Sequence, residues 1–135
     1  METTTQTPVA STKRLWAGRI LSTIAALFMI FDGVMHILMP PAVVEGFTKA
    51  GWPLSTARPI AIIELLCLTL YLIPRTSVLG AVLLTGYLGG AVAVNVRQLL
   101  PLFGYVLAPV YVALFLWGGL YLRDARLREI FPIRW

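Results

Sequence analysis

The sequence predicts an all-α integral membrane protein with four membrane-spanning helices in one bundle, and three observations lead to this fold class. First, 59 % of the 135 residues are hydrophobic and only 13 % are charged, about half the charged fraction of a soluble domain. Second, the mean hydropathy of +0.83 is too high for a chain whose surface faces water. Third, the apolar residues fall into four runs, and a helix of about 20 residues crosses the ~30 Å hydrocarbon core of a bilayer.

The first predicted span covers residues 15–39. It ends at Pro40-Pro41, because neither proline can donate to the helical hydrogen-bond ladder. The following segment, 42–56, mixes apolar and charged side chains. We expect it to form a short interfacial helix that lies along the membrane surface or folds over the mouth of the bundle.

The other three spans are predicted over residues 57–73, 76–97 and 102–122. The motif IPRT between the second and the third is too short for anything but a tight reversal, so these two helices are antiparallel neighbours. A turn that contains Pro101 separates the third span from the fourth.

The third span carries Gly86, Gly89 and Gly90 within one short stretch. Small residues let membrane helices approach to backbone contact. We therefore expect the helix over 76–97 to be the central packing element of the bundle, with these glycines at its interface. The alternative is that the glycines leave room for a ligand.

Two polar segments flank the spans. Residues 1–14 have nothing to bury and are predicted to form a disordered cytoplasmic tail, and residues 123–135 a basic cytoplasmic tail. With four spans, the basic residues divide unequally between the two sides of the membrane, with only Lys49, Arg58 and Arg97 on the outer one.

The positive-inside rule then predicts that both termini are cytoplasmic. The net charge of +5 is explained by this topology and by attraction to anionic lipid. A nucleic-acid partner is not expected.

Three ionisable residues interrupt the apolar runs: Asp32 and His36 in the first span and Glu64 in the second. Asp32 and His36 are four apart and share one helix face. Because the first two spans are antiparallel, Asp32 and Glu64 lie at a similar depth, roughly 10 Å from the outer surface at ~1.5 Å per residue. Asn95 and Arg97, at the outer end of the third span, are within reach of that depth. The sequence therefore predicts an outward-facing polar pocket formed by Asp32, His36, Glu64, Asn95 and Arg97.

This pocket has two interpretations. In one, Arg97 and His36 neutralise the two carboxylates and the network only fixes the register of the helices. In the other, the carboxylates and His36 bind a small polar head group or move protons to a bound redox molecule, since charges inside a membrane are often functional. No residue is assigned a catalytic role.

Other chemistry has little support in the sequence. A haem held by two histidines is excluded, because His36 is the only histidine. One histidine with two carboxylates could hold a metal ion, but no HxxxH or ExxH spacing supports such a site, so a metal ion is not expected. No GxGxxG, Walker-type or GxSxG motif encodes a cofactor site or a nucleophile. The single cysteine, Cys67, excludes an intramolecular disulfide and a CxxC pair.

Several blocks of the chain, taken together, resemble the DoxX-like family of small four-helix membrane proteins. They are RILS, FDGVMH, ARPIAIIELLCLTLYLIPRT, LGAVLLTGYLGGAVAVNVR and PVYVALFLWGGLYLRD. The resemblance implies a DoxX-like domain over 15–122 in the inner membrane of a bacterium. It also implies a link to respiratory oxidoreductases, because more distant DoxX and DoxD relatives are associated with them, a thiosulfate:quinone oxidoreductase among these.

Two functions from different classes are therefore expected. In the first, the protein is a subunit or accessory of a membrane oxidoreductase system and binds a quinone or similar small molecule. Asp32 and Glu64 then accept protons, His36 relays them and Arg97 anchors an anionic or carbonyl group. In the second, it is a non-catalytic membrane protein that binds lipid or small molecules, or scaffolds a partner or a second copy of itself through its glycine face and basic tail.

Overall fold

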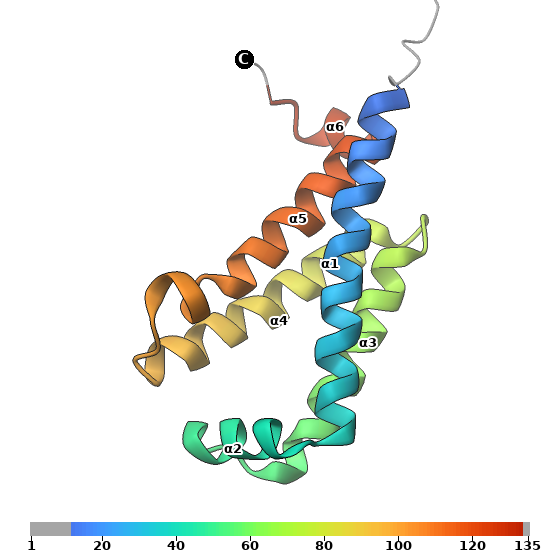
Figure 1. Ribbon diagram of the computed structural model, residues 1–135. Coiled ribbons are helices and arrows are strands. Elements are labelled where there is room, and N and C mark those ends of the chain that lie inside the picture. The colour runs from blue at the N-terminus through green and yellow to red at the C-terminus, as the bar shows by residue number, and fades with distance from the viewer. Residues whose placement is uncertain (1–11, 134–135) are drawn as a thin grey trace, which may run out of the picture.

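The computed structural model describes residues 12–133, and its regular structure is helical (Figure 1). The elements in chain order are α1 (Thr12–Leu38), α2 (Pro41–Ala50), the single 3₁₀ turn η1 (Leu54–Thr56), α3 (Ala57–Leu72), α4 (Ser77–Arg97), the short π-helical segment η2 (Leu102–Val106), α5 (Ala108–Arg123) and α6 (Ala125–Ile130).

Four segments are long and apolar enough to cross a membrane: Thr12–Leu38, Leu54–Leu72, Ser77–Arg97 and Leu102–Arg123. The predicted all-α protein with four spans is thus confirmed. The orientation of its termini stays a prediction.

The two predicted tails begin or end differently from the expectation. Thr12–Arg14 belong to α1, whereas the sequence analysis expected the whole segment 1–14 to be disordered. The other residues of that segment lie outside the described part. After α5, Asp124 accepts hydrogen bonds from the backbone N–H groups of Arg126 and Leu127 and so caps α6. Leu127 is buried against the bundle.

The reversal between α3 and α4 is stabilised by two hydroxyl groups that satisfy the free carbonyls at the end of α3. The Ser77 hydroxyl lies 2.8 Å from the Tyr71 carbonyl oxygen and 2.9 Å from that of Ile73. The Thr76 hydroxyl donates to the Leu70 carbonyl over 2.7 Å. Unpaired carbonyl groups are costly inside a membrane, so these bonds favour the tight antiparallel hairpin that the sequence predicts.

Close helix contacts depend on glycines other than the ones expected. A Cβ atom at Gly18 would lie 2.8 Å from the Gly119 carbonyl oxygen, and one at Gly80 would lie 2.5 Å from the Tyr71 Cα. Glycine therefore permits the crossing of α1 with α5 at Gly18 and Gly119, and that of α3 with α4 at Gly80.

The predicted packing role of Gly86, Gly89 and Gly90 is wrong for contacts within this chain. All three are exposed, and a Cβ built on any of them has no neighbouring atom within 4 Å. The reason is visible in Figure 1: α5 crosses α1 near the end where α1 begins, α4 passes behind the middle of α1, and both diverge from α1 and α3 toward the end where α2 lies. These glycines lie on the diverging half of α4.

The apolar core lies where the helices are close together. Its largest fully buried side chains include Met29, Tyr71, Leu84, Leu116 and Leu120.

Candidate functional site

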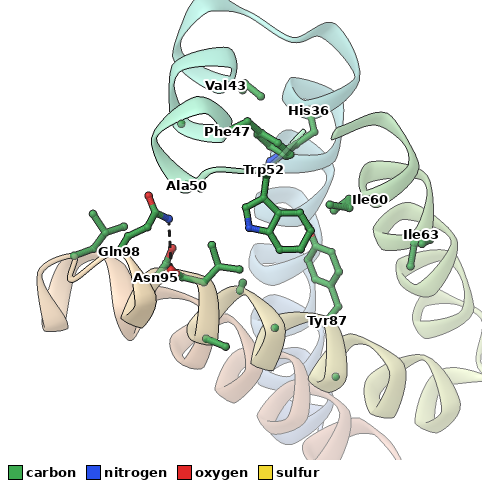
Figure 2. A pocket seen from close by; sticks show the side chains of 17 residues that line it. His36, Val43, Phe47, Ala50, Trp52, Ile60, Ile63, Tyr87, Asn95 and Gln98 are labelled. Atoms are coloured by element: carbon green, nitrogen blue, oxygen red, sulfur yellow. Dashed lines mark hydrogen bonds between the residues drawn. The ribbon is translucent and has the colours of Figure 1, made fainter. Parts of the chain in front are cut away.

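A cavity of about 730 Å³ occupies the divergent end of the bundle, between α2, α3 and α4 (Figure 2). Most of its wall is apolar. Its lining residues are His36, Val43, Gly46, Phe47, Ala50, Trp52, Ile60, Ile63, Gly86, Tyr87, Gly90, Ala91, Ala93, Val94, Asn95, Gln98 and Leu100.

Two ring side chains in this wall, His36 and Tyr87, are each backed by a carboxylate. The Tyr87 hydroxyl donates to Glu64 Oε2 over 3.0 Å. His36 Nδ1 lies 2.7 Å from the Asp32 carbonyl oxygen and 3.4 Å from Asp32 Oδ2. An Nδ1–H that donates to this carbonyl leaves Nε2 as the free ring nitrogen. The cavity wall thus contains two hydrogen-bonding side chains, each in contact with an acidic side chain.

The two carboxylates belong to one cluster. Asp32, His36 and Glu64 each offer a ligand-type atom, and these atoms all lie within 4.8 Å of one another. Glu64 is only 1 % exposed, whereas the Asp32 side chain is 39 % exposed. A histidine nitrogen beside two carboxylates can hydrogen-bond to a polar ligand or hold a cation.

Helix α2 closes this end of the bundle. It starts directly after Pro40 and ends at Gly51, whose φ of 72° is in the left-handed region that glycine adopts readily. No residue of α2 is buried. Its Phe47 ring contacts the His36 ring edge-on, with centroids 5.5 Å apart. Val43, Gly46, Phe47 and Ala50 of α2 line the cavity, and the placement of residues 42–56 relative to the membrane surface stays a prediction.

Aromatic side chains give the cavity its shape. Figure 2 shows the Trp52 indole pointing into the cavity from the α2 side, with Phe47 near His36 above it. Concave pockets lined by apolar and aromatic side chains with a few polar groups are typical of sites for small organic molecules.

The structure places the five predicted pocket residues in three ways. Asp32, His36 and Glu64 come together as described. Asn95 lines the same cavity, and its amide donates to the Tyr105 carbonyl over 2.8 Å. Arg97 is exposed and does not line the cavity.

The predicted neutralisation of the carboxylates by Arg97 does not occur. Among residues 12–133, no ion pair joins Arg97 to Asp32 or Glu64. Arg97 is the last residue of α4, and the divergence of α4 from α1 and α3 takes this turn away from the carboxylates. Asp32 has His36 as its neighbour instead.

The expectation of no metal site depended on spacing within single segments. The structure groups Asp32 and His36 from α1 with Glu64 from α3, a ligand set that no motif along one helix could reveal. One histidine nitrogen and two carboxylate oxygens are ligands that divalent metals accept.

Tyr87 and Trp52 are functional candidates that the sequence analysis missed. The signal for Tyr87 was present, because a phenol hydroxyl inside a membrane helix needs a hydrogen-bond partner. Glu64, the acceptor it finds, is on the neighbouring helix, so the pairing depends on the three-dimensional register.

Comparisons with known proteins identify a family. No curated protein matches the chain, and no solved structure does. The model of the DoxX-like family matches residues 20–119, a range that contains α2, α3, α4 and all the residues of the cavity. The chain therefore belongs to the DoxX-like family.

Proposed function

We propose that the protein is a subunit or accessory of a membrane oxidoreductase system, and that its cavity binds a quinone or a similar small ring molecule. One observation carries the proposal: the two hydrogen-bonding rings in an otherwise apolar wall, His36 and Tyr87, are each backed by a carboxylate. A ligand with a flat apolar body and polar oxygen atoms matches such a wall.

The roles of the side chains follow from their contacts. When Glu64 carries a proton, the Tyr87 hydroxyl no longer donates to it and donates to an oxygen atom of the ligand instead. A protonated His36 donates to the ligand from Nε2, and Asp32 and Glu64 accept or supply the protons. Reduction of a quinone to a quinol takes two electrons and two protons. The protons come from this cluster and the electrons from a partner redox protein, because the sequence encodes no redox motif. The bundle lies in the inner membrane of a bacterium with both termini in the cytoplasm.

The test uses the purified protein in lipid nanodiscs and a short-chain quinone, decylubiquinone. Binding is measured by quenching of tryptophan fluorescence, since Trp52 lines the cavity. Tyr87→Phe should weaken binding about fivefold, the effect of one hydrogen bond worth about 1 kcal/mol. Glu64→Gln should leave the fold intact and abolish binding, because it removes the acid behind Tyr87.

A matched pair of glycine variants separates cavity filling from general damage. Gly90 lines the cavity and Gly89, its neighbour on α4, does not. Both are exposed with no atom near a built Cβ. Gly90→Leu should therefore block quinone binding, while Gly89→Leu should not. Equal binding by these two variants would contradict the proposal. Mass spectrometry that finds only bulk lipid in the wild type and in Glu64→Gln would favour a non-catalytic lipid-binding or scaffold protein instead.

A divalent metal ion held by Asp32, His36 and Glu64 is a second candidate, and the proximity of their ligand atoms favours it. Three protein ligands with an open position are the usual set of a catalytic zinc site. Metal analysis after loading with Zn²⁺ or Mn²⁺ tests it. Asp32→Asn should lower the bound metal and Tyr87→Phe should not, whereas quinone binding should respond to Tyr87→Phe.

A further inference from the structure

A second cavity lies at the opposite end of the bundle, where α1 begins and α5 ends. Its volume is about 240 Å³, the share of about eight water molecules in the liquid. The residues that line it are Arg19, Ser22, Thr23, Ala26, Leu27, Leu72 and Arg123. Two cations, two hydroxyl side chains and three apolar side chains therefore face one small space.

A chain of hydrogen bonds fixes Arg123 at this cavity. Arg123 Nε donates to the Ser22 hydroxyl over 3.2 Å. The Ser22 hydroxyl in turn lies 2.9 Å from the Tyr71 hydroxyl, which donates to the Leu116 carbonyl over 2.6 Å. The guanidinium carbon of Arg123 lies 5.1 Å from the centre of the Tyr71 ring. The guanidinium group is thus held in place before any ligand arrives.

This arrangement leaves donor capacity unused and gives neither arginine an acidic partner within the described residues. The guanidinium carbon of Arg19 lies 5.6 Å from the centre of the Trp16 ring. Arg123 Nη2 is buried and has no hydrogen-bond partner within the described part of the chain, and a buried donor without a partner is costly. No acidic residue lines the cavity. Neither Arg19 nor Arg123 forms one of the ion pairs found among residues 12–133. An anion is the missing counterpart.

We propose that this cavity binds a phosphate group, as carried by the head group of an anionic phospholipid. Arginine guanidinium groups match the geometry of phosphate oxygens, and the Thr23 hydroxyl adds a donor. Arg19 lies about 10 Å along α1 from its first residue at ~1.5 Å per residue, close to the end of the span, where head groups lie. Leu27 and Leu72 are 62 % and 49 % exposed and give the acyl chains an apolar path from the cavity.

The test is native mass spectrometry of the detergent-purified protein with three lipids and one salt. The lipids are phosphatidylglycerol, zwitterionic phosphatidylcholine and phosphate-free diacylglycerol, and the salt is inorganic phosphate. We expect phosphatidylglycerol to bind most tightly and diacylglycerol not to bind above background. Competition between inorganic phosphate and phosphatidylglycerol distinguishes the carrier: tight binding of the free ion alone would keep the phosphate site and reject the lipid as its source.

Charge-matched variants show whether the cavity is responsible. Arg19→Gln and Arg123→Gln should each weaken phosphatidylglycerol binding about tenfold or more, as expected for loss of a hydrogen bond to a charged group. Arg75→Gln removes the same charge from the loop between α3 and α4, outside the cavity, and should leave binding unchanged. Equal losses in all three variants, or no loss in the first two, would overturn the proposal. Arg19 is exposed, so its variant keeps the test decisive even where Arg123→Gln fails to fold.

Discussion

The closest approach of α3 to α4 gives the sharpest test of the fold, through the variant Gly80→Ala. The added Cβ would lie 2.5 Å from the Tyr71 Cα and 2.8 Å from the Leu70 carbonyl carbon. Carbon atoms in contact are normally about 3.5–4.0 Å apart. The obstacle is the backbone of a helix and cannot rotate away, so α4 must shift by about 1 Å at this point.

The expected loss of stability has two parts and one offset. Overpacking costs about 1–3 kcal/mol. The shift also weakens the hydrogen bonds from the Ser77 hydroxyl to the Tyr71 and Ile73 carbonyls, each worth about 1 kcal/mol. Alanine regains about 1 kcal/mol of helix propensity over glycine. With half of the strength of these two bonds lost, Gly80→Ala should lower the free energy of unfolding by about 1–3 kcal/mol.

The control is Gly89→Ala on the same helix, where a Cβ meets no atom within 4 Å. This variant should be as stable as the wild type or up to about 1 kcal/mol more stable. The free energy of unfolding is measured by SDS titration in mixed micelles. Destabilisation of Gly89→Ala to the same extent as Gly80→Ala would refute the assignment of the glycine contacts and would return Gly89 to a helix interface.

Three further predictions test the contacts between elements and the orientation. Trp117→Phe removes the 2.7 Å hydrogen bond from the Trp117 indole to the Thr85 hydroxyl and should lower the free energy of unfolding by about 1 kcal/mol. A double-mutant cycle with Thr85→Val should give a coupling energy of similar size. A coupling energy of zero would contradict this hydrogen bond. The 2.9 Å contact with Lys49 lowers the pKa of the Glu45 carboxyl. The contribution of this ion pair to the stability of α2 should therefore be present at neutral pH and be lost as the pH falls through that lowered pKa. An NMR titration in which Glu45 has the pKa of an unpaired glutamate would disprove this. Green fluorescent protein fused after the last residue should fluoresce and alkaline phosphatase there should be inactive, since both termini are predicted to be cytoplasmic.

The number and position of the spans could be predicted because the apolar runs indicate the membrane helices and the prolines indicate where helices end. Pro40-Pro41 and the IPRT reversal end helices by local chemistry, and the structure has its helix ends within a few residues of them. The proximity of Asp32 to Glu64 also followed from sequence, because equal distances from one reversal place residues of antiparallel helices at equal depth.

The tilt of α4 could not be predicted in this way. Tilt depends on packing against neighbouring helices and not on the length of an apolar run. A close contact at Gly80 with no comparable contact at Gly86 or Gly90 allows α4 to lean away from α3. The expectations for Arg97 and for Gly86, Gly89 and Gly90 fail for this single reason, because both required α4 to stay close to its neighbours over its whole length.

The divergence of α4 also explains why the cavity between α2, α3 and α4 lies at one end of the bundle. Had α4 packed along its whole length, Gly86 and Gly90 would face a helix and the cavity that they line would not exist. Between this cavity and the one that Arg19 lines, the core holds Met29, Leu84 and Leu116, each 1 % exposed or less. Apolar side chains of this kind separate the two cavities. The acidic cluster and the cationic cavity are therefore distinct sites at opposite ends of the bundle.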